Sequence, residues 1–392
     1  MNPSANGWIK KYFGEKHADY QLFANLDHEE IITKIRNLGF TYGVIDTKLL
    51  PEIYKGFSYT REEICKIIYL QLLEKVYYSS SKNNLNNEGF IEELINFYNL
   101  LIPHKTNIFS SLFTSKNSYS KVEDIFTMRW KDNFFSHSKT NDITLNIILL
   151  NIDIIAFQAY LAGEVNPYAY SQNLINKLIE IIIAFKEVKI DKNEKDIQLL
   201  AFLNKSLTSE HTEQQSFNIQ SHYRKCFLMD VIICNSWNNI TKEIIIPDLS
   251  KEPFLSCHIT KQIEEDSKLA FEQFLEKVNY DYYFYRSSNL LDNVIKNSTS
   301  SIETLLIRNK KRLIKELQKN SQLMKLLVDS TYRELNTEEK QLIKKQTIEV
   351  IKTIPSLAIF ILPGGGVLLP IILKFIPSLL PSSFNENIDE DN

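Results

Sequence analysis

IPSLAIFILPGGGVLLPIILKFIPSLLP, residues 354–381, is the stretch that decides the predicted fold, and Lys374 is its single charge. Prolines at positions 355, 363, 370 and 377 are eight, seven and seven residues apart, so a continuous helix would gather them towards one side. Proline inside an ordinary helix removes a hydrogen bond and breaks or kinks the helix, whereas a plain membrane anchor needs no such spacing. The stretch therefore predicts a C-terminal apolar helical segment that proline and glycine interrupt.

The composition outside this stretch is that of a globular helical protein. Hydrophobic residues make up 44% and charged residues 24% of the 392 residues, values that are typical of soluble domains. Ten glycines and eleven prolines leave long uninterrupted segments, and no strand alternation persists. We predict an all-α fold built from one or more multi-helix bundles, and the length favours two or three units.

Local signals place several helix ends. Gly39 suits the left-handed end of a helix that we expect over residues 18–38. Thr60 and Glu63 have the spacing of a capping box, and apolar residues at helical spacing predict an amphipathic helix after it. Further helices are expected over residues 90–101, from 167, over 197–207, 220–235 and 268–278, and as one long helix from 301.

A second apolar run, residues 143–161, has the length of a membrane span. Four polar residues within it are costly to place in lipid, and these are Asn146, Asn151, Asp153 and Gln158. A buried core helix is therefore the favoured interpretation.

The organisation of the chain follows from its less regular parts. The mixed composition of residues 102–141 predicts a surface loop or short helices and a domain seam, and residues 244–246 predict a lone extended segment outside any sheet. We divide the chain into an N-terminal helical region (1–140), a central helical domain (141–298), a basic helix with the apolar segment (299–384) and an acidic tail (385–392).

Charge is concentrated next to the apolar stretch. Residues 299–352 contain twelve Lys or Arg and seven Asp or Glu, a local excess of +5. If the stretch crosses a bilayer, such a basic flank stays on the cytoplasmic side. Thr337 is expected to cap the last helix before the stretch. The residues proposed as a patch for an anionic partner are Arg308, Lys310, Lys311, Arg312, Lys315 and Lys319.

No arrangement of residues predicts catalysis, a metal or a cofactor. The seven histidines form no pair at metal-binding spacing, the four cysteines stand alone, and phosphate-loop and nucleophile-elbow motifs are missing from the sequence. Single cysteines favour a reducing compartment, and the first twenty residues lack the apolar core of a signal peptide. We expect a non-enzymatic protein with its bulk in the cytoplasm.

Residues 335–384 resemble the membrane-proximal core of the leucine zipper and EF-hand containing transmembrane protein family. The resemblance begins at Leu335, Thr337, Glu339, Leu342 and Thr347 and continues through ordered prolines and aromatics. The residues assigned to this family motif or membrane segment are Pro355, Phe360, Pro363, Gly364, Gly365, Gly366, Leu369, Pro370, Lys374, Phe375, Pro377, Pro381 and Phe384.

The resemblance implies a membrane protein that is linked to ion homeostasis, cation/proton exchange or ribosome docking. A LETM-like bacterial branch is described as biofilm-associated, and the bias towards Ile, Lys and Asn fits a bacterial source. Two differences stand out. The family has a Pro-Phe-Met-Glu-like segment where this chain has Pro363 followed by three glycines, so the intramembrane carboxylate is missing. The family's ribosome-binding domain follows the apolar segment, and here eight residues follow Phe384.

Three hypotheses remain open at this point. In the first, residues 354–381 hold a helical protein at the inner membrane, because 28 helical residues span about 42 Å against roughly 30 Å of hydrocarbon. In the second, the same residues form a buried hairpin in a soluble scaffold, with the glycines at its turn. In the third, the protein is a cation/proton exchanger, and the carboxylates for ion exchange come from another part of the chain or from an oligomer, because the stretch itself has none. The basic helix would bind membrane lipid or the ribosome through unspecific electrostatics, without reading a nucleic-acid sequence.

Overall fold

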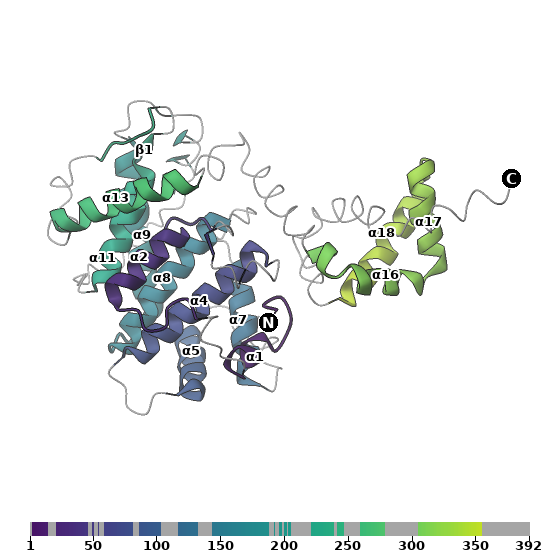
Figure 1. Cartoon of the computed structure of the whole chain (residues 1–392), viewed down its shortest axis with the longest axis horizontal. Coiled ribbons are helices and arrows are strands. Elements are labelled where there is room, and N and C mark those ends of the chain that lie inside the picture. The colour runs from purple at the N-terminus through teal and green to yellow at the C-terminus, as the bar shows by residue number, and fades with distance from the viewer. Residues whose placement is uncertain are drawn as a thin grey trace.

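The all-α prediction is confirmed. The computed structural model describes residues 2–14, 21–45, 49–50, 54, 59–80, 86–102, 117–131, 143–187, 192, 196–197, 200–201, 203–204, 221–238, 241–246, 259–278 and 305–354. Its helices are α1 (Trp8–Gly14), α2 (His28–Leu38), α4 (Arg61–Tyr78), α5 (Asn87–Leu101), α7 (Ser118–Lys131), α8 (Ile143–Leu161), α9 (Pro167–Glu187), α11 (His222–Asn235), α13 (Lys261–Lys277), α16 (Lys310–Gln318), α17 (Ser321–Tyr332) and α18 (Thr337–Lys352) (Figure 1).

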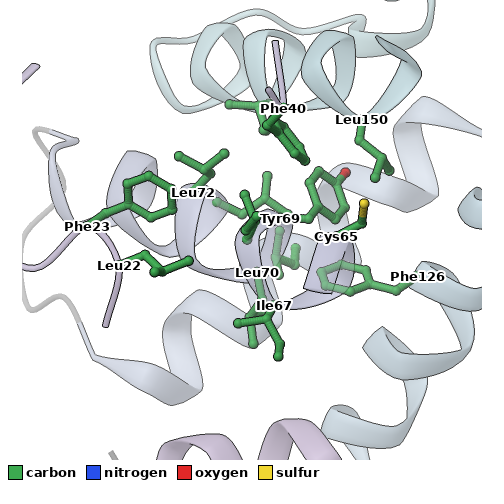
Figure 2. Packing of buried hydrophobic residues seen from close by; sticks show 14 of the residues in the cluster. Leu22, Phe23, Phe40, Cys65, Ile67, Tyr69, Leu70, Leu72, Phe126 and Leu150 are labelled. Carbon is green, nitrogen blue, oxygen red and sulfur yellow. The ribbon is translucent and has the colours of Figure 1, made fainter. Parts of the chain in front are cut away.

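Helix α4 lies at the centre of the main core. The predicted capping box is present, because the Thr60 hydroxyl accepts from the Glu63 amide and the Glu63 carboxylate accepts from the Thr60 amide. The amphipathic prediction is wrong, since side chains on every side of the helix are buried. Figure 2 shows side chains from other segments closing around it, among them Phe23, Phe126 and Leu150. A helix with no exposed face is the interior element of a bundle.

Polar side chains of α4 have partners inside the core. The carboxylate of Glu74 accepts a hydrogen bond of 2.8 Å from the Tyr12 hydroxyl. The side-chain oxygen of Gln71 accepts one of 2.8 Å from the backbone amide of Leu22. These contacts join the N-terminal segment to α4, because a buried polar group without a partner would be costly.

Helix α8 confirms the prediction of a buried core helix. Asn151 and Asp153 are completely buried. Asp153 is held by two hydrogen bonds from Arg129 of α7, at 2.7 and 2.6 Å, while the amide of Asn151 donates to the backbone oxygens of Phe40 and Ile147. None of the helices described by the structure is both long enough and apolar enough to cross a membrane.

Within residues 102–141, predicted as a surface loop or short helices, α7 is a helix, but it is buried and does not lie on the surface. Val122, Ile125 and Phe126 of this helix are buried in the same core as α4 and α8. The Glu123 carboxylate also accepts from the amides of Gly7 and Ile9 at the start of α1, at 2.7 and 2.8 Å. Frequent polar and aromatic residues hid the helical period. The described helices before and after residue 140 share this core, and the four-part division of the chain stays a prediction.

Helix α2 shows where the reading of boundaries succeeded and failed. It begins at His28, ten residues after the predicted start, because Asp27 and Glu30 form a capping box that stops it. Its end at Gly39 is confirmed, and the φ of 78° at this glycine is left-handed. The helix predicted over residues 268–278 shows the opposite error, because α13 starts earlier than predicted, at Lys261 after the cap Thr260.

A second part of the core lies between α2, α9, α11 and α13. Arg36 of α2 forms an ion pair of 2.9 Å with Asp230 of α11, and both side chains are almost fully buried. Beside it, strand β1 (Trp237–Asn238) pairs antiparallel with β2 (Glu243–Ile244). The predicted extended segment therefore exists, but in a two-stranded ribbon, contrary to the expectation that it stays outside a sheet. We refer to α1–α13 with this ribbon as the body.

Candidate functional site

Residues 305–354 form a separate helical unit, which we call the C-terminal unit. Its helices α16, α17 and α18 pack on one another and lie together in Figure 1. Their apolar side chains make a cluster whose members all come from this unit: Leu305, Leu306, Leu313, Leu317, Leu323, Met324, Leu326, Leu327, Leu335, Ile343, Val350, Ile351 and Ile354. Among the described helices, extensive packing occurs within the body or within the unit, and none joins the two.

The predicted long helix from residue 301 is broken in this unit. Helix α16 ends at Gln318, and the side chain of Asn320 accepts from the Leu323 amide to cap α17. Asparagine competes for backbone hydrogen bonds and favours such caps over helix interiors. The break lets the leucines on both sides face a common core. A single straight helix would carry them apart.

The turn between α17 and α18 is held by side-chain contacts. Asn336, one residue before the predicted cap Thr337, is the N-cap of α18 and forms a capping box with Glu339. Arg333 donates to Asp329 at 2.7 Å and to both carboxylate oxygens of Glu339, at 2.9 and 2.8 Å. Glu339 in the first turn of α18 is therefore engaged in contacts that hold the turn. The lysines further along the helix take no part in these contacts.

The six cations proposed as a patch divide into two groups. Arg308 is paired with the body, Arg312 donates to the backbone oxygen of Thr353 at 3.0 Å, and Lys319 pairs with Glu316 at 2.8 Å. The other three, Lys310, Lys311 and Lys315, are exposed and have no ion-pair partner among the residues that the structure describes. They are the members of the patch that are available to an anion.

Helix α18 adds cations that were not assigned from the sequence. Lys340, Lys344, Lys345 and Lys352 are exposed, and within the described ranges none of them has an ion pair. The signal was present in the series Glu338-Glu339-Lys340 and Lys344-Lys345, because the acids end in the first turn and the lysines continue. From the sequence, this helix was predicted only as the last helix before the apolar segment. It also carries exposed lysines without an ion pair among the described residues, as α16 does.

Arg308 connects the C-terminal unit to the body. Its guanidinium donates two parallel hydrogen bonds to Glu63 of α4, at 2.7 and 2.8 Å. The Glu63 side chain is fully buried and Arg308 is 21% exposed. Burial raises the pKa of the Glu63 carboxyl, but the hydrogen bonds from Arg308 and from the Thr60 amide outweigh it, and the net pKa is lowered. Glu63 thus caps α4 and receives the C-terminal unit with the same carboxylate.

The family-motif residues 355–384 lie outside the described residues. Of the apolar stretch, only Ile354 is described, and it is buried in the core of the C-terminal unit. Arg312 contacts the residue just before it through the Thr353 carbonyl. The start of the stretch is therefore fixed to α16 and α18. The predicted range 299–384, which groups the basic helix with the apolar segment, remains a prediction.

Three of the four cysteines lie in the described part of the chain. No cluster of His, Cys, Asp and Glu there has a metal-binding arrangement. Cys65, Cys226 and Cys234 are free and buried, and burial raises the pKa of the Cys226 thiol to about 12. A thiol of such high pKa carries little of the thiolate that acts as a nucleophile. The remaining cysteine, Cys257, lies outside the described residues.

Comparison with known proteins gives a family match that begins in this unit and continues beyond it. The family model described as "LETM1-like, RBD" matches residues 335–392. The match begins before the apolar segment and includes α18, so the expectation that this domain lies wholly after that segment is corrected. Helices α16 and α17 share a core with α18 but precede the matched range. Neither a curated protein nor a solved structure matches the chain.

Proposed function

We propose that this chain is a non-enzymatic docking protein that binds the ribosome through the unpaired lysines of its C-terminal unit, beside a membrane reached by residues 354–381. One observation carries the proposal. The match described as LETM1-like, RBD covers α18, and α18 shares one core with the basic helix α16. In the family that the sequence resembles, RBD denotes a ribosome-binding domain.

The charge distribution supports an anionic partner for this unit. Residues 305–354 contain twelve Lys or Arg and six Asp or Glu, a net charge of +6. The other 342 residues contain 33 basic and 42 acidic side chains, a net charge of −9. A polyanion attracts the unit and repels the rest of the chain, so the protein would approach the ribosome with the unit in front. Phosphates bind such lysines without regard to base sequence.

The membrane part of the proposal rests on the apolar stretch. Its 28 residues carry one charge, and in helical form they are long enough for a roughly 30 Å hydrocarbon core. The described end of α18 leads directly into the stretch. A ribosome bound at α16 and α18 would therefore be held close to the bilayer. Basic residues beside a membrane segment also favour the cytoplasmic side, where ribosomes are found.

Lys310→Gln, Lys311→Gln and Lys315→Gln combined are expected to weaken ribosome binding about tenfold or more. Each lysine lost removes about one counterion-releasing contact, so the slope of log K against log salt should become shallower by about two to three. The measurement is co-sedimentation of the full chain with purified ribosomes over a series of salt concentrations. Glutamine keeps the length and helix propensity of the side chain, so α16 should remain folded.

A matched control is available on the body. Lys261, Lys268 and Lys277 are exposed lysines of α13, and their combined replacement by glutamine removes the same charge. This variant should bind ribosomes within about twofold of the unmodified protein, because α13 lies outside the C-terminal unit, in the part of the chain with a net negative charge. Equal loss of binding in both variants would overturn the assignment to the C-terminal unit. Ribosome binding that neither variant alters would overturn it as well.

A further inference from the structure

The contact between Arg308 and Glu63 joins the C-terminal unit to the body. It belongs to the basic stretch by sequence, since Arg308 precedes Lys311 and Arg312 by one helical turn. Its guanidinium is nevertheless committed to a fully buried carboxylate. Two parallel hydrogen bonds in a dehydrated setting are the strong form of such a pair. Arg308, which lies next to the exposed lysines of α16 in the sequence, is thus paired with the carboxylate of Glu63.

Within the residues that the structure describes, this pair joins the two parts without a shared apolar cluster. The apolar cluster of the unit contains only residues 305–354, and the clusters of the body contain none of them. The unit and the remainder of the chain carry net charges of opposite sign. Attachment through charge responds to salt and to competing ions. A shared apolar core would not respond to a competing anion in this way.

We propose that the Arg308–Glu63 ion pair is a latch that docks the C-terminal unit on the body, and that a ribosome competes for Arg308 and so releases the unit. This inference rests on the proposed function for the identity of the competing anion. In the docked state the basic helix is held beside an acidic body, which lowers its attraction for phosphate. In the released state Arg308, two residues before the start of α16, is exposed beside Lys310, Lys311 and Lys315. Release and binding therefore favour each other, as linkage requires.

Glu63→Gln tests the latch without touching the basic surface. Glutamine can still accept the Thr60 amide hydrogen bond of the capping box, so α4 keeps its cap while the ionic attraction for Arg308 is lost. Docking is measured by single-molecule energy transfer between dyes on Gln273→Cys in α13 and Gln341→Cys in α18, both exposed positions, with Cys257→Ser to prevent extra labelling. Without ribosomes, Glu63→Gln should replace the single docked separation by a broad distribution.

The same variant should bind ribosomes more tightly. If the unit is docked in about 80% of molecules, removing the docked state improves the apparent dissociation constant about fivefold. Glu272→Gln, an exposed acid of α13, removes the same charge from the body and should leave both the dye separation and the affinity unchanged. Arg308→Met, a second way to break the pair, should also broaden the separation, but without the gain in affinity, because it removes a cation from the surface.

The outcomes separate the latch from the proposed function. An unchanged dye separation in both Glu63→Gln and Arg308→Met overturns the latch. A broadened separation with an affinity equal to that of Glu272→Gln overturns the competition between ribosome and Glu63. If neither the unmodified chain nor any variant binds ribosomes, the proposed function is overturned, and the competition between ribosome and Glu63 is overturned with it. The separation measured without ribosomes still decides whether the ion pair docks the unit.

Discussion

Arg129→Met is expected to lower the free energy of unfolding of the body by about 3–5 kcal/mol, the usual cost of leaving one charge of a buried pair behind. Asp153 is completely buried, and two hydrogen bonds of 2.7 and 2.6 Å from Arg129 balance its charge. Tyr69 also donates to this carboxylate, at 3.2 Å, which does not replace a cation. Urea unfolding followed by far-UV circular dichroism gives the change in midpoint.

The double variant Arg129→Met with Asp153→Leu separates charge from packing. Replacing both members of a buried pair by apolar groups is often neutral or stabilising, so much of the lost stability should return. Lys177→Met, which breaks a half-exposed pair with Glu180 on α9, should have little effect. Equal destabilisation by the single and the double variant would contradict the electrostatic account and would assign the loss to the shape of the Arg129 side chain.

Gly39→Ala is expected to destabilise the body by about 2–4 kcal/mol, which combines left-handed backbone strain with overpacking. Gly39 has a φ of 78°, and a Cβ there would meet the Val44 carbonyl and lie 2.7 Å from the ring of Phe274. Neither neighbour can yield easily, because one is backbone and the other is a buried ring of α13. Thermal unfolding should show a lower midpoint than for the unmodified chain.

Gly163→Ala is the matched control for that variant. Gly163 also has a left-handed backbone, with a φ of 107°, but nothing lies within 4 Å of a Cβ built on it. Its replacement should cost only the backbone strain, about 1 kcal/mol. If the two alanine variants lose the same stability, the close approach of α2, Val44 and α13 at Gly39 has no energetic role.

Local chemistry explains which parts of the fold were predictable. The capping box at Thr60, the glycine that ends α2 and the polar residues that keep α8 out of lipid are each properties of a few neighbouring residues. They act in the same way wherever the segment lies. The errors occurred where short-range rules conflict. Asp27 and Asn320 are the N-caps of α2 and α17, and each lies inside a longer apolar pattern that predicted one continuous helix. The capping hydrogen bond fixes the start of the helix there, whatever the apolar pattern predicts.

Contacts between distant residues were not predictable from local patterns. The residues around Arg129 of α7 and Asp153 of α8 do not show that these two side chains form an ion pair. The same holds for Arg308, which the sequence groups with the basic patch and the structure pairs with Glu63, 245 positions away. Charge density placed the candidate site on α16, and that placement stays a prediction. Only the packing of α16 with α18 shows that the unpaired lysines extend over two helices of one unit.

Photo-crosslinking to the ribosome tests the central claim most directly. A photoreactive amino acid is placed in the full chain at Gln318 of α16 or at Gln341 of α18, or at Gln273 of α13 as the control. All three are exposed glutamines, so every lysine of the unit stays in place. The account predicts crosslinks to ribosomal RNA from positions 318 and 341 and none from position 273. Ribosomal crosslinks from position 273 alone, or from no position, would contradict it.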